Sequence, residues 1–280
     1  MVISIAHLGP KGTYSEAAAS AYGDWLTSQG QESILSPCPS IAQTLHRVAQ
    51  GKADVAVVPV ENSIQGSVTM TLDTFWELDQ LRIQRGLVLP IFHTLLSFAP
   101  SLSEIKTVYS HPQALGQCQG WLNKFLPTVK LVPTNATTES LQYLDKDPTA
   151  AGIASSRAAQ LYNLPILVEQ INDHAENCTR FWIVDLQGTD RGHYFSLALS
   201  VPANVPGALV KPLSVFAKRE INLSRIESRP TKRSLGEYVF FLDLEGCATD
   251  EKMQSALAEL SEYAEVVKIF GSYSILPVDL

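Results

Sequence analysis

The first two thirds of the chain repeat one local unit four times, and this repetition limits the folds that the chain can adopt. In each unit a short apolar stretch runs into a polar turn, and the residues after the turn carry a helix start signal. The apolar stretches are residues 2–6, 53–60, 107–109 and 151–154. Strands that alternate with helices are typical of parallel sheets, because each helix carries the chain back across the sheet. The sequence therefore predicts an α/β fold with a parallel sheet.

Polar residues follow each apolar stretch at the point where the strand should end. They are residues 9–15 (GPKGTYS), 61–63 (ENS), 110–112 (SHP) and 155–157 (SSR). In α/β sheets ligands bind outside the carboxyl ends of the strands, where helix N-termini offer free amide groups and a positive dipole. Four such ends in one chain favour a small anionic ligand.

The middle of the chain, roughly residues 90–172, is expected to form a second lobe. Residues 82–92 hold a strand-like apolar run that would cross to this lobe, and residues 167–171 would return from it. The prediction is a two-lobed α/β unit whose cleft is lined by both halves.

A polar, glycine-bearing break at residues 187–192 (QGTDRG) marks the expected domain boundary. After it we expect strands at residues 194–201, 222–227, 238–245 and 266–270, and helices at residues 207–219 and 250–264. The order βαββαβ is the ferredoxin-like arrangement, which leaves a sheet edge free to pair with a second copy.

Charge and composition argue against nucleic-acid and membrane partners. The net charge is −7 and the pI is near 5.4, so a general basic surface is not expected. The first residues lack a basic segment, and no stretch approaches the roughly 20 apolar residues of a membrane span. The four cysteines are far apart without a C-x-x-C pair, which is typical of reduced thiols. We expect a cytoplasmic protein.

Residues 177–181 (NCTRF) place an amide, a hydroxyl and a guanidinium in front of an apolar run. The chain shows no Ser-His-Asp order, metal-ligand spacing or phosphate loop beside them, so their chemistry should depend on hydrogen bonding and charge. Taken alone, the segment could also be a capped strand start with a surface arginine.

Four segments, residues 9–15, 58–63, 110–118 and 177–181, closely resemble in order the motifs of the prephenate dehydratase family. The tail resembles the ACT regulatory domain of that family, and residues 206–209 (PGAL) and 226–230 (IESRP) resemble its two phenylalanine-binding segments. The resemblance covers nearly the whole chain. It implies a two-lobed, periplasmic-binding-protein-like catalytic unit in residues 1–186 and an ACT domain in residues 194–280.

Two features differ from what the family suggests. Some relatives carry an N-terminal chorismate mutase domain, whereas this sequence begins directly at the dehydratase strand, so we expect no mutase activity. Residues 135–140 (NATTES) are less rich in alanine than expected, which leaves the substrate contacts near them open.

The resemblance implies conversion of prephenate to phenylpyruvate, water and carbon dioxide, without a cofactor or metal. Thr179 is the expected hydrogen-bond donor to the leaving hydroxyl, and Glu61, Asn62 or a bound water would supply the proton. Arg180 would hold the pyruvyl carboxylate, and Phe181 would provide a dry pocket for the departing carboxylate. The other expected substrate contacts are Thr13, Ser15, Ser63, His111 and Asn177.

The resemblance also implies inhibition by L-phenylalanine bound at a contact between ACT domains, in a homodimer or homotetramer. The residues expected to bind it are Gly207, Ala208, Leu209, Asn222, Leu223, Glu227, Ser228, Arg229 and Pro230.

Other readings of the same residues are weaker. A cysteine hydrolase using His111 and Cys118 lacks a third group to orient the base. Metal ligation by His111, His174 and Glu61 lacks a fixed ligand spacing. Residues 9–13 lack the pattern of a nucleotide-binding loop. Arogenate dehydratase, which shares these motifs, and a non-catalytic small-molecule binding protein remain as alternatives.

Overall fold

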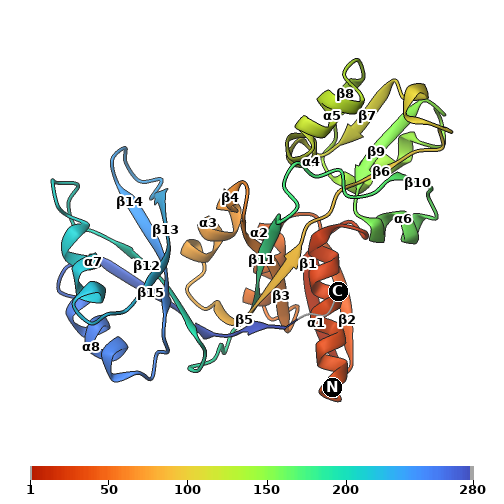
Figure 1. Ribbon diagram of the computed structural model, residues 1–280. Helices are drawn as coiled ribbons and strands as arrows, with labels where there is room; N and C mark the ends of the chain where they lie inside the picture. The colour runs from red at the N-terminus through yellow and green to blue at the C-terminus, as the bar shows by residue number, and fades with distance from the viewer. Residues whose placement is uncertain (1, 278–280) are drawn as a thin grey trace.

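The computed structural model describes residues 2–277 and shows two α/β lobes followed by a C-terminal domain (Figure 1). The first lobe is built on a sheet with the strand order β16-β5-β11-β3-β1-β2, with β4 beside β3. Its strands are β1 (Ile3–Leu8), β2 (Ser33–Cys38), β3 (Val55–Asn62), β4 (Gly66–Ser67), β5 (Arg82–Pro90), β11 (Cys178–Asp185) and β16 (Ile275–Leu276). Its helices are α1 (Tyr14–Ser28), α2 (Ile41–Ala49) and α3 (Thr69–Glu77).

The second lobe has its own sheet, with the order β10-β6-β9-β7-β8. Its strands are β6 (Thr94–Leu96), β7 (Thr107–Ser110), β8 (Lys130–Pro133), β9 (Ala150–Ala154) and β10 (Ile166–Val168). Its helices are α4 (Pro112–Gln117), α5 (Gln119–Phe125) and α6 (Ser156–Tyr162), with 3₁₀ turns η1 (Leu102–Glu104) and η2 (Thr137–Tyr143). Pro112 is the first residue of α4, a position that does not need its missing N–H.

The four predicted strand–turn–helix units are present, but the sheets are mixed rather than parallel. Strand β1 pairs in parallel with β2 and β3, and β7 pairs in parallel with β8 and β9. Strand β11 runs antiparallel to both β3 and β5, and β6 runs antiparallel to β9. The antiparallel strands, β6 and β11, are the first strands after the two crossovers between the lobes. The chain enters each sheet there from the opposite direction.

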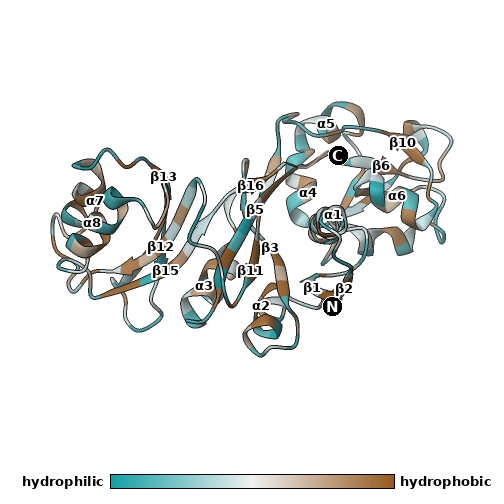
Figure 2. Ribbon diagram, turned by 90° about the horizontal axis from the view of Figure 1, so that it is seen from below, coloured by the Kyte–Doolittle hydropathy of each residue, from teal (hydrophilic) through white to brown (hydrophobic). Residues whose placement is uncertain are grey.

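The C-terminal domain has a sheet of order β13-β14-β12-β15, with its helices on the outer face, away from the first lobe (Figures 1 and 2). Its elements are β12 (Tyr194–Ser200), α7 (Val210–Ala217), β13 (Leu223–Pro230), β14 (Tyr238–Glu245), α8 (Glu251–Leu260) and β15 (Val266–Tyr273). The predicted βαββαβ order is therefore present. Helix α7 begins later than expected, because residues 205–209 form a turn in which Gly207 has a φ of 81°.

The last described strand does not stay with the C-terminal domain. Strand β16 returns to the first lobe and pairs in parallel with β5, where it covers an open sheet edge. Gly86 allows this approach, since a Cβ there would lie 2.4 Å from Cδ1 of Ile275. The expected domain of residues 194–280 thus contributes a strand to the first lobe.

The inner face of the C-terminal sheet packs on the first lobe through a continuous apolar core. The ring of Phe75 lies edge-on to both Trp182 and Phe270, with centroid distances of 5.1 Å in each case. Phe241 and Tyr273 belong to the same buried cluster. The first lobe and the C-terminal domain therefore share one core. Across residues 2–277, the helices are too short or too polar to cross a membrane.

Candidate active site

The side chain of Asn62, at the end of β3, is held in one orientation by backbone groups. Its Oδ1 accepts hydrogen bonds from the N–H groups of Ile64 and Gln65, both at 3.1 Å. Its Nδ2 donates to the carbonyl oxygen of Cys178 at 3.1 Å. A backbone N–H can only donate and a carbonyl can only accept, so these contacts fix which end of the amide is which.

This fixed amide also holds Thr179, which lies directly opposite Asn62 in the pairing of β11 with β3. Asn62 Nδ2 donates to Thr179 Oγ1 at 3.0 Å. Within residues 2–277, the hydroxyl of Thr179 donates to no protein acceptor. The hydroxyl is thus oriented by one hydrogen bond, and its proton is not used in a contact with another described residue.

Asn177 and Gln117 close a ring of amide hydrogen bonds with Asn62. Asn62 Nδ2 donates to Asn177 Oδ1 at 2.8 Å, and Asn177 Nδ2 donates to Gln117 Oε1 at 3.1 Å. Gln117 Nε2 donates back to Asn62 Oδ1 at 3.2 Å. All three side chains are buried, so the ring is a rigid support for Thr179.

Glu61 and Arg180 lie on the opposite face of the same two strands, because successive residues of a strand alternate between faces. They are paired with each other across β3 and β11, and their side chains lie 3.8 Å apart. Arg180 also lies 3.4 Å from Asp243 of the C-terminal domain. The structure does not bring either residue to Thr179, and both face the domain contact instead.

A cavity of about 470 Å³ between the lobes brings Thr13 and His111 together. Thr13 caps α1, where Oγ1 accepts from the N–H of Glu16 at 3.3 Å and donates to the Pro10 carbonyl oxygen at 2.9 Å. His111 caps α4, where Nδ1 accepts from the N–H of Gln113 at 3.2 Å. Burial lowers the pKa of His111, which favours the neutral ring. The other lining residues include Asn135, Ala136 and Thr137.

The turn after β3 connects this cavity to the amide ring. Gln65, whose N–H contacts Asn62, donates from its side chain to the carbonyl oxygen of Gln113 at 3.5 Å. Ser63 lies in the same turn, and its Oγ accepts from the N–H of Cys178 at 3.0 Å.

Ser15, Phe181 and Cys118 are largely covered by protein. Ser15 is buried in the first turn of α1. Phe181 is 1% exposed and belongs to the core between α1 and the sheet. Cys118 is buried in the core of the second lobe, and this burial raises its pKa. Cys118 is therefore a core residue, as expected, and not an activated nucleophile.

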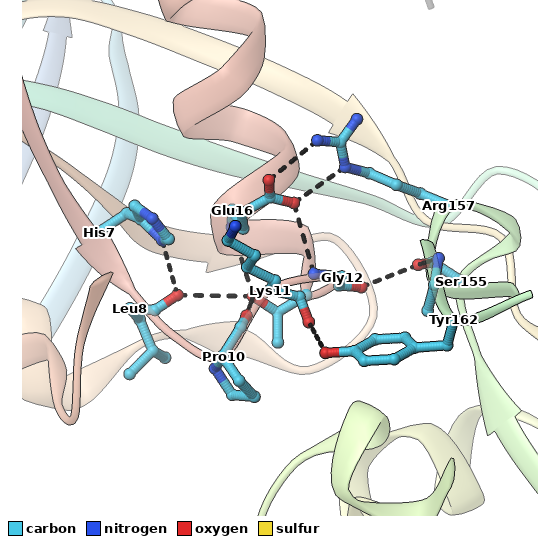
Figure 3. A network of polar contacts seen from close by, with 11 residues as sticks. His7, Leu8, Pro10, Lys11, Gly12, Glu16, Ser155, Arg157 and Tyr162 are labelled. Carbon is cyan, nitrogen blue, oxygen red and sulfur yellow. Dashed lines mark hydrogen bonds and ion pairs between the residues drawn. The ribbon is translucent and has the colours of Figure 1, made fainter. Parts of the chain in front are cut away.

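The lobes also touch beside the cleft, through a network that joins the start of α1 to the start of α6 (Figure 3). Arg157 makes a two-pronged contact with the carboxylate of Glu16, with distances of 2.8 and 2.9 Å. Ser155 Oγ donates to the carbonyl oxygen of Gly12 at 3.0 Å, and Tyr162 Oη donates to that of Lys11 at 3.1 Å. Segments far apart in the sequence are thus held together at the edge of the cleft.

We expect the contact between Glu16 and Arg157 to stabilise the protein only above acidic pH. Burial alone would raise the pKa of Glu16, but the hydrogen bonds and charge of Arg157 and the Gly12 N–H outweigh it and lower the pKa. A carboxylate with a lowered folded pKa contributes stability above its unfolded value of 4.5 and loses it as the pH falls through the folded pKa. The Tm deficit of Glu16→Gln relative to the unaltered chain should be largest at pH 7, shrink as the pH falls below 4.5 and vanish once the pH lies below the folded pKa of Glu16. A deficit that persists unchanged at low pH would contradict this.

The residues expected to bind an effector lie at two places in the C-terminal domain. Gly207, Ala208 and Leu209 form the turn before α7, and residues 227–230 lie within β13. Two of them already have partners in the first lobe. Glu227 accepts from Ser67 Oγ at 3.1 Å, and Arg229 contacts Asp73 at 2.8 and 3.1 Å.

The remaining expected residues lie at the start of β13 or beside these contacts. Asn222 precedes β13, and its carbonyl oxygen accepts from the N–H of Glu245 at 2.9 Å. Leu223 begins the strand, while Ser228 and Pro230 flank Arg229. The two predicted segments therefore sit at the turn before α7 and along the edge strand of the sheet.

Gln117 belongs to the site but was not among the expected residues. It lies at the end of the segment 110–118 that resembles a family motif, and only the structure shows that its amide reaches Asn62.

Together, the features define a two-lobed α/β protein with a cavity between the lobes and a fused βαββαβ domain. The model of the prephenate dehydratase family matches residues 5–189, and the ACT domain model matches residues 195–262. The chain therefore belongs to the prephenate dehydratase family and carries an ACT domain.

Comparisons with individual relatives support the assignment to this family. A bifunctional chorismate mutase/prephenate dehydratase of Aquifex aeolicus is 41% identical over 97% of this chain and 73% of the relative. A prephenate dehydratase of Lactococcus lactis subsp. cremoris is 37% identical over 98% of both chains. The crystal structure of a prephenate dehydratase from Arthrobacter aurescens in complex with L-Phe has a TM-score of 0.85 and 36% identity, and the match covers 97% of this chain and 90% of that one.

Proposed function

We propose that this chain converts prephenate to phenylpyruvate, water and carbon dioxide, and that phenylalanine regulates the reaction. The observation that carries the proposal is the hydroxyl of Thr179, which is oriented by Asn62 and keeps its proton for a ligand. Loss of the hydroxyl and carboxylate makes the substrate ring aromatic, so the substrate supplies the driving force. The protein needs to align the departing groups and assist one of them, which requires no cofactor.

Thr179 donates a hydrogen bond to the leaving hydroxyl, where negative charge grows only in the transition state. The hydrogen bond that Thr179 accepts from Asn62 polarises its own O–H and makes it a better donor. Glu61 faces the domain contact, so we assign the proton that completes the leaving water to bulk solvent, from which a bound water molecule passes it on by giving one proton and taking up another.

The cavity beside Thr13 and His111 receives the pyruvyl side chain of the substrate. Its lining contains no arginine or lysine among the described residues, and its one carboxylate, that of Glu139, accepts hydrogen bonds from Asn135 at 2.7 and 3.4 Å. We therefore assign the contacts with the substrate carboxylate to the hydroxyl of Thr13 and the imidazole of His111. We assign Arg180 to the contact with the C-terminal domain, because its side chain lies beside Asp243.

Formation of phenylpyruvate from prephenate and from arogenate, with and without phenylalanine, tests the proposal. Turnover of prephenate that phenylalanine suppresses supports both parts. Turnover of arogenate alone would leave the assigned site unchanged but would identify the substrate as arogenate, which carries an amino acid side chain. Turnover of neither contradicts the enzymatic proposal and favours a binding protein.

Phenylalanine binding at β13 would compete with the contacts between β13 and the first lobe. The effector's ammonium and carboxylate groups match the charges of Glu227 and Arg229, which now contact Ser67 and Asp73. Such an exchange of partners would couple effector binding to the catalytic unit. Coupling free energies of this kind are typically about 1–3 kcal/mol.

We expect Arg229→Gln to keep turnover and raise the phenylalanine concentration for half inhibition at least about tenfold. Asp73→Asn is the matched variant, since it removes the same contact but leaves Arg229 free. It should make inhibition require less phenylalanine. Equal inhibition of both variants and the unaltered chain would contradict the competition.

A homodimer or homotetramer would form through the edge of the C-terminal sheet. Strand β13 is an edge strand, and β14 is its only strand partner among the described residues. Its exposed Ile226 would add an apolar contact. Light scattering of the full chain measures the assembly, and a monomer at all concentrations would contradict it. We propose the cytoplasm as its location.

A further inference from the structure

His93 lies in the first crossover between the lobes, next to β6, and its ring is buried against the amide ring of the site. Its Nε2 lies 2.7 Å from Gln117 Oε1. The residue is 3% exposed, and its Nδ1 is buried without a partner among the described residues. His93 is not one of the three residues of the amide ring, and it lies outside the sequence motifs.

The proton position on His93 follows from the backbone contacts of Asn62. Those contacts fix the amide of Asn62, which in turn fixes Asn177 and Gln117, so that Oε1 of Gln117 faces the imidazole. An amide oxygen can only accept, so Nε2 of His93 must carry a proton. Burial lowers the pKa of His93 against a smaller opposing effect of Gln117, which favours the neutral ring with Nδ1 unprotonated.

The backbone around His93 leaves the ring little freedom to move. The N–H of His93 donates to Asn172 Oδ1 at 2.6 Å, and its carbonyl oxygen accepts from the N–H of Ile171 at 2.9 Å. Both partners belong to the second crossover. Tyr14 donates to the carbonyl oxygen of Phe92 and lies edge-on to the His93 ring.

An apolar side chain would satisfy packing at this position better than histidine does. A buried nitrogen without a partner destabilises the folded state, so packing alone gives no reason for an imidazole here. The hydrogen bond to Gln117 gives one, because without it Oε1 of Gln117 would face apolar surroundings with Asn177 as its single donor.

We propose that His93 is a positioning residue for the reaction, which holds Gln117 of the second lobe against the fixed amide of Asn62 and so keeps the second lobe in place beside Thr179. This inference rests on the proposed function. The hydrogen bonds run from the crossover through Gln117 of the second lobe to Asn62 of the first, so His93 also ties the site to the junction of the lobes.

Replacement of His93 tests the proposal through kcat. His93→Leu removes the donor and should lower kcat for prephenate about 10- to 100-fold, with KM changed less than about threefold, because a misplacement of about 1 Å costs up to about 100-fold. His93→Gln places an N–H2 group near the position of Nε2 and should recover kcat to within about fivefold. Unchanged turnover in His93→Leu, or no recovery in His93→Gln, would overturn the proposal.

The Gln117→Leu background distinguishes positioning from a general structural role. If His93 acts through Gln117, adding His93→Leu to Gln117→Leu should cause no further loss of kcat. Losses that multiply would show that His93 acts by another route. Should His93→Leu not fold, His93→Asn replaces it, since its shorter amide occupies the place of Nδ1 and does not reach Gln117.

The proton position can be measured without activity. ¹⁵N NMR of the full chain should show His93 protonated at Nε2 and unprotonated at Nδ1 around pH 7, and a proton at Nδ1 alone would overturn the proposal. Absence of turnover in the unaltered chain would contradict the proposed function, while this measurement still decides the hydrogen bond to Gln117.

Discussion

Thr179→Ala should lower kcat for prephenate by about 100- to 1,000-fold and leave KM nearly unchanged. That loss is typical when one transition-state donor is removed, because the interaction is absent from the ground state. Stability should change little. Asn62 Nδ2 loses one acceptor but keeps Asn177 Oδ1 and the Cys178 carbonyl oxygen, so no buried donor is left without a partner. Steady-state rates and Tm, measured on the same preparation, separate a loss of catalysis from a loss of stability.

Thr179→Ser is the matched control for that variant. It keeps the hydroxyl and loses only the methyl group, so kcat should fall far less than in Thr179→Ala. Arg180→Gln provides a second comparison, since Arg180 is the next residue of β11 but lies on the other face. If Thr179→Ala mainly raised KM, the hydroxyl would contribute to binding and not to departure of the leaving group.

Sequence patterns predict two segments that the structure brings together at the lobe junction. Segments 61–63 and 177–181 stand out because polar groups lie beside apolar runs, and the structure pairs Asn62 with Thr179 across two neighbouring strands. The order of elements in the C-terminal domain was also predictable, because turn residues and apolar periodicity change together near residue 190.

The face on which Glu61 and Arg180 lie could not be read from the sequence. The pattern suggested that the strand ends before Glu61, whereas β3 continues through Asn62 and pairs with β11. Within a strand, neighbours point to opposite faces, so the side chains of Glu61 and Asn62 lie on opposite sides of the sheet. Which face of β3 and β11 borders the cleft depends on where the C-terminal domain packs. Local sequence patterns carry no information about that packing.

Gln117 and His93 were missed for a different reason. The two residues lie 24 positions apart, and a hydrogen bond between positions so distant leaves no local pattern in the sequence. A sequence signal exists only in retrospect, since a histidine in the apolar run of residues 91–96 must find a partner when buried.

Asp243→Ala should be the most destabilising single change at the domain contact. Asp243 is 1% exposed, and it accepts from Arg225 Nε at 2.7 Å and from Ser196 Oγ at 2.6 Å. Its removal leaves the guanidinium of Arg225, whose side chain is 7% exposed, buried without its carboxylate. Breaking a buried pair in this way costs about 3–5 kcal/mol, which should lower Tm by on the order of 10 °C.

The loss should come from the uncompensated charge and not from missing volume. A double variant, Asp243→Leu with Arg225→Met, removes both charges and should recover much of the Tm, because a buried ion pair is often no more stable than an apolar pair of similar size. Lys252→Gln, which breaks an exposed ion pair with Glu220, should leave Tm nearly unchanged. If the double variant were as unstable as Asp243→Ala, the hydrogen bond from Ser196, which both variants lose, would be the more important contact of Asp243. Arg180 keeps Glu61 as a partner in either variant, so the faces of β3 and β11 behind Thr179 remain paired.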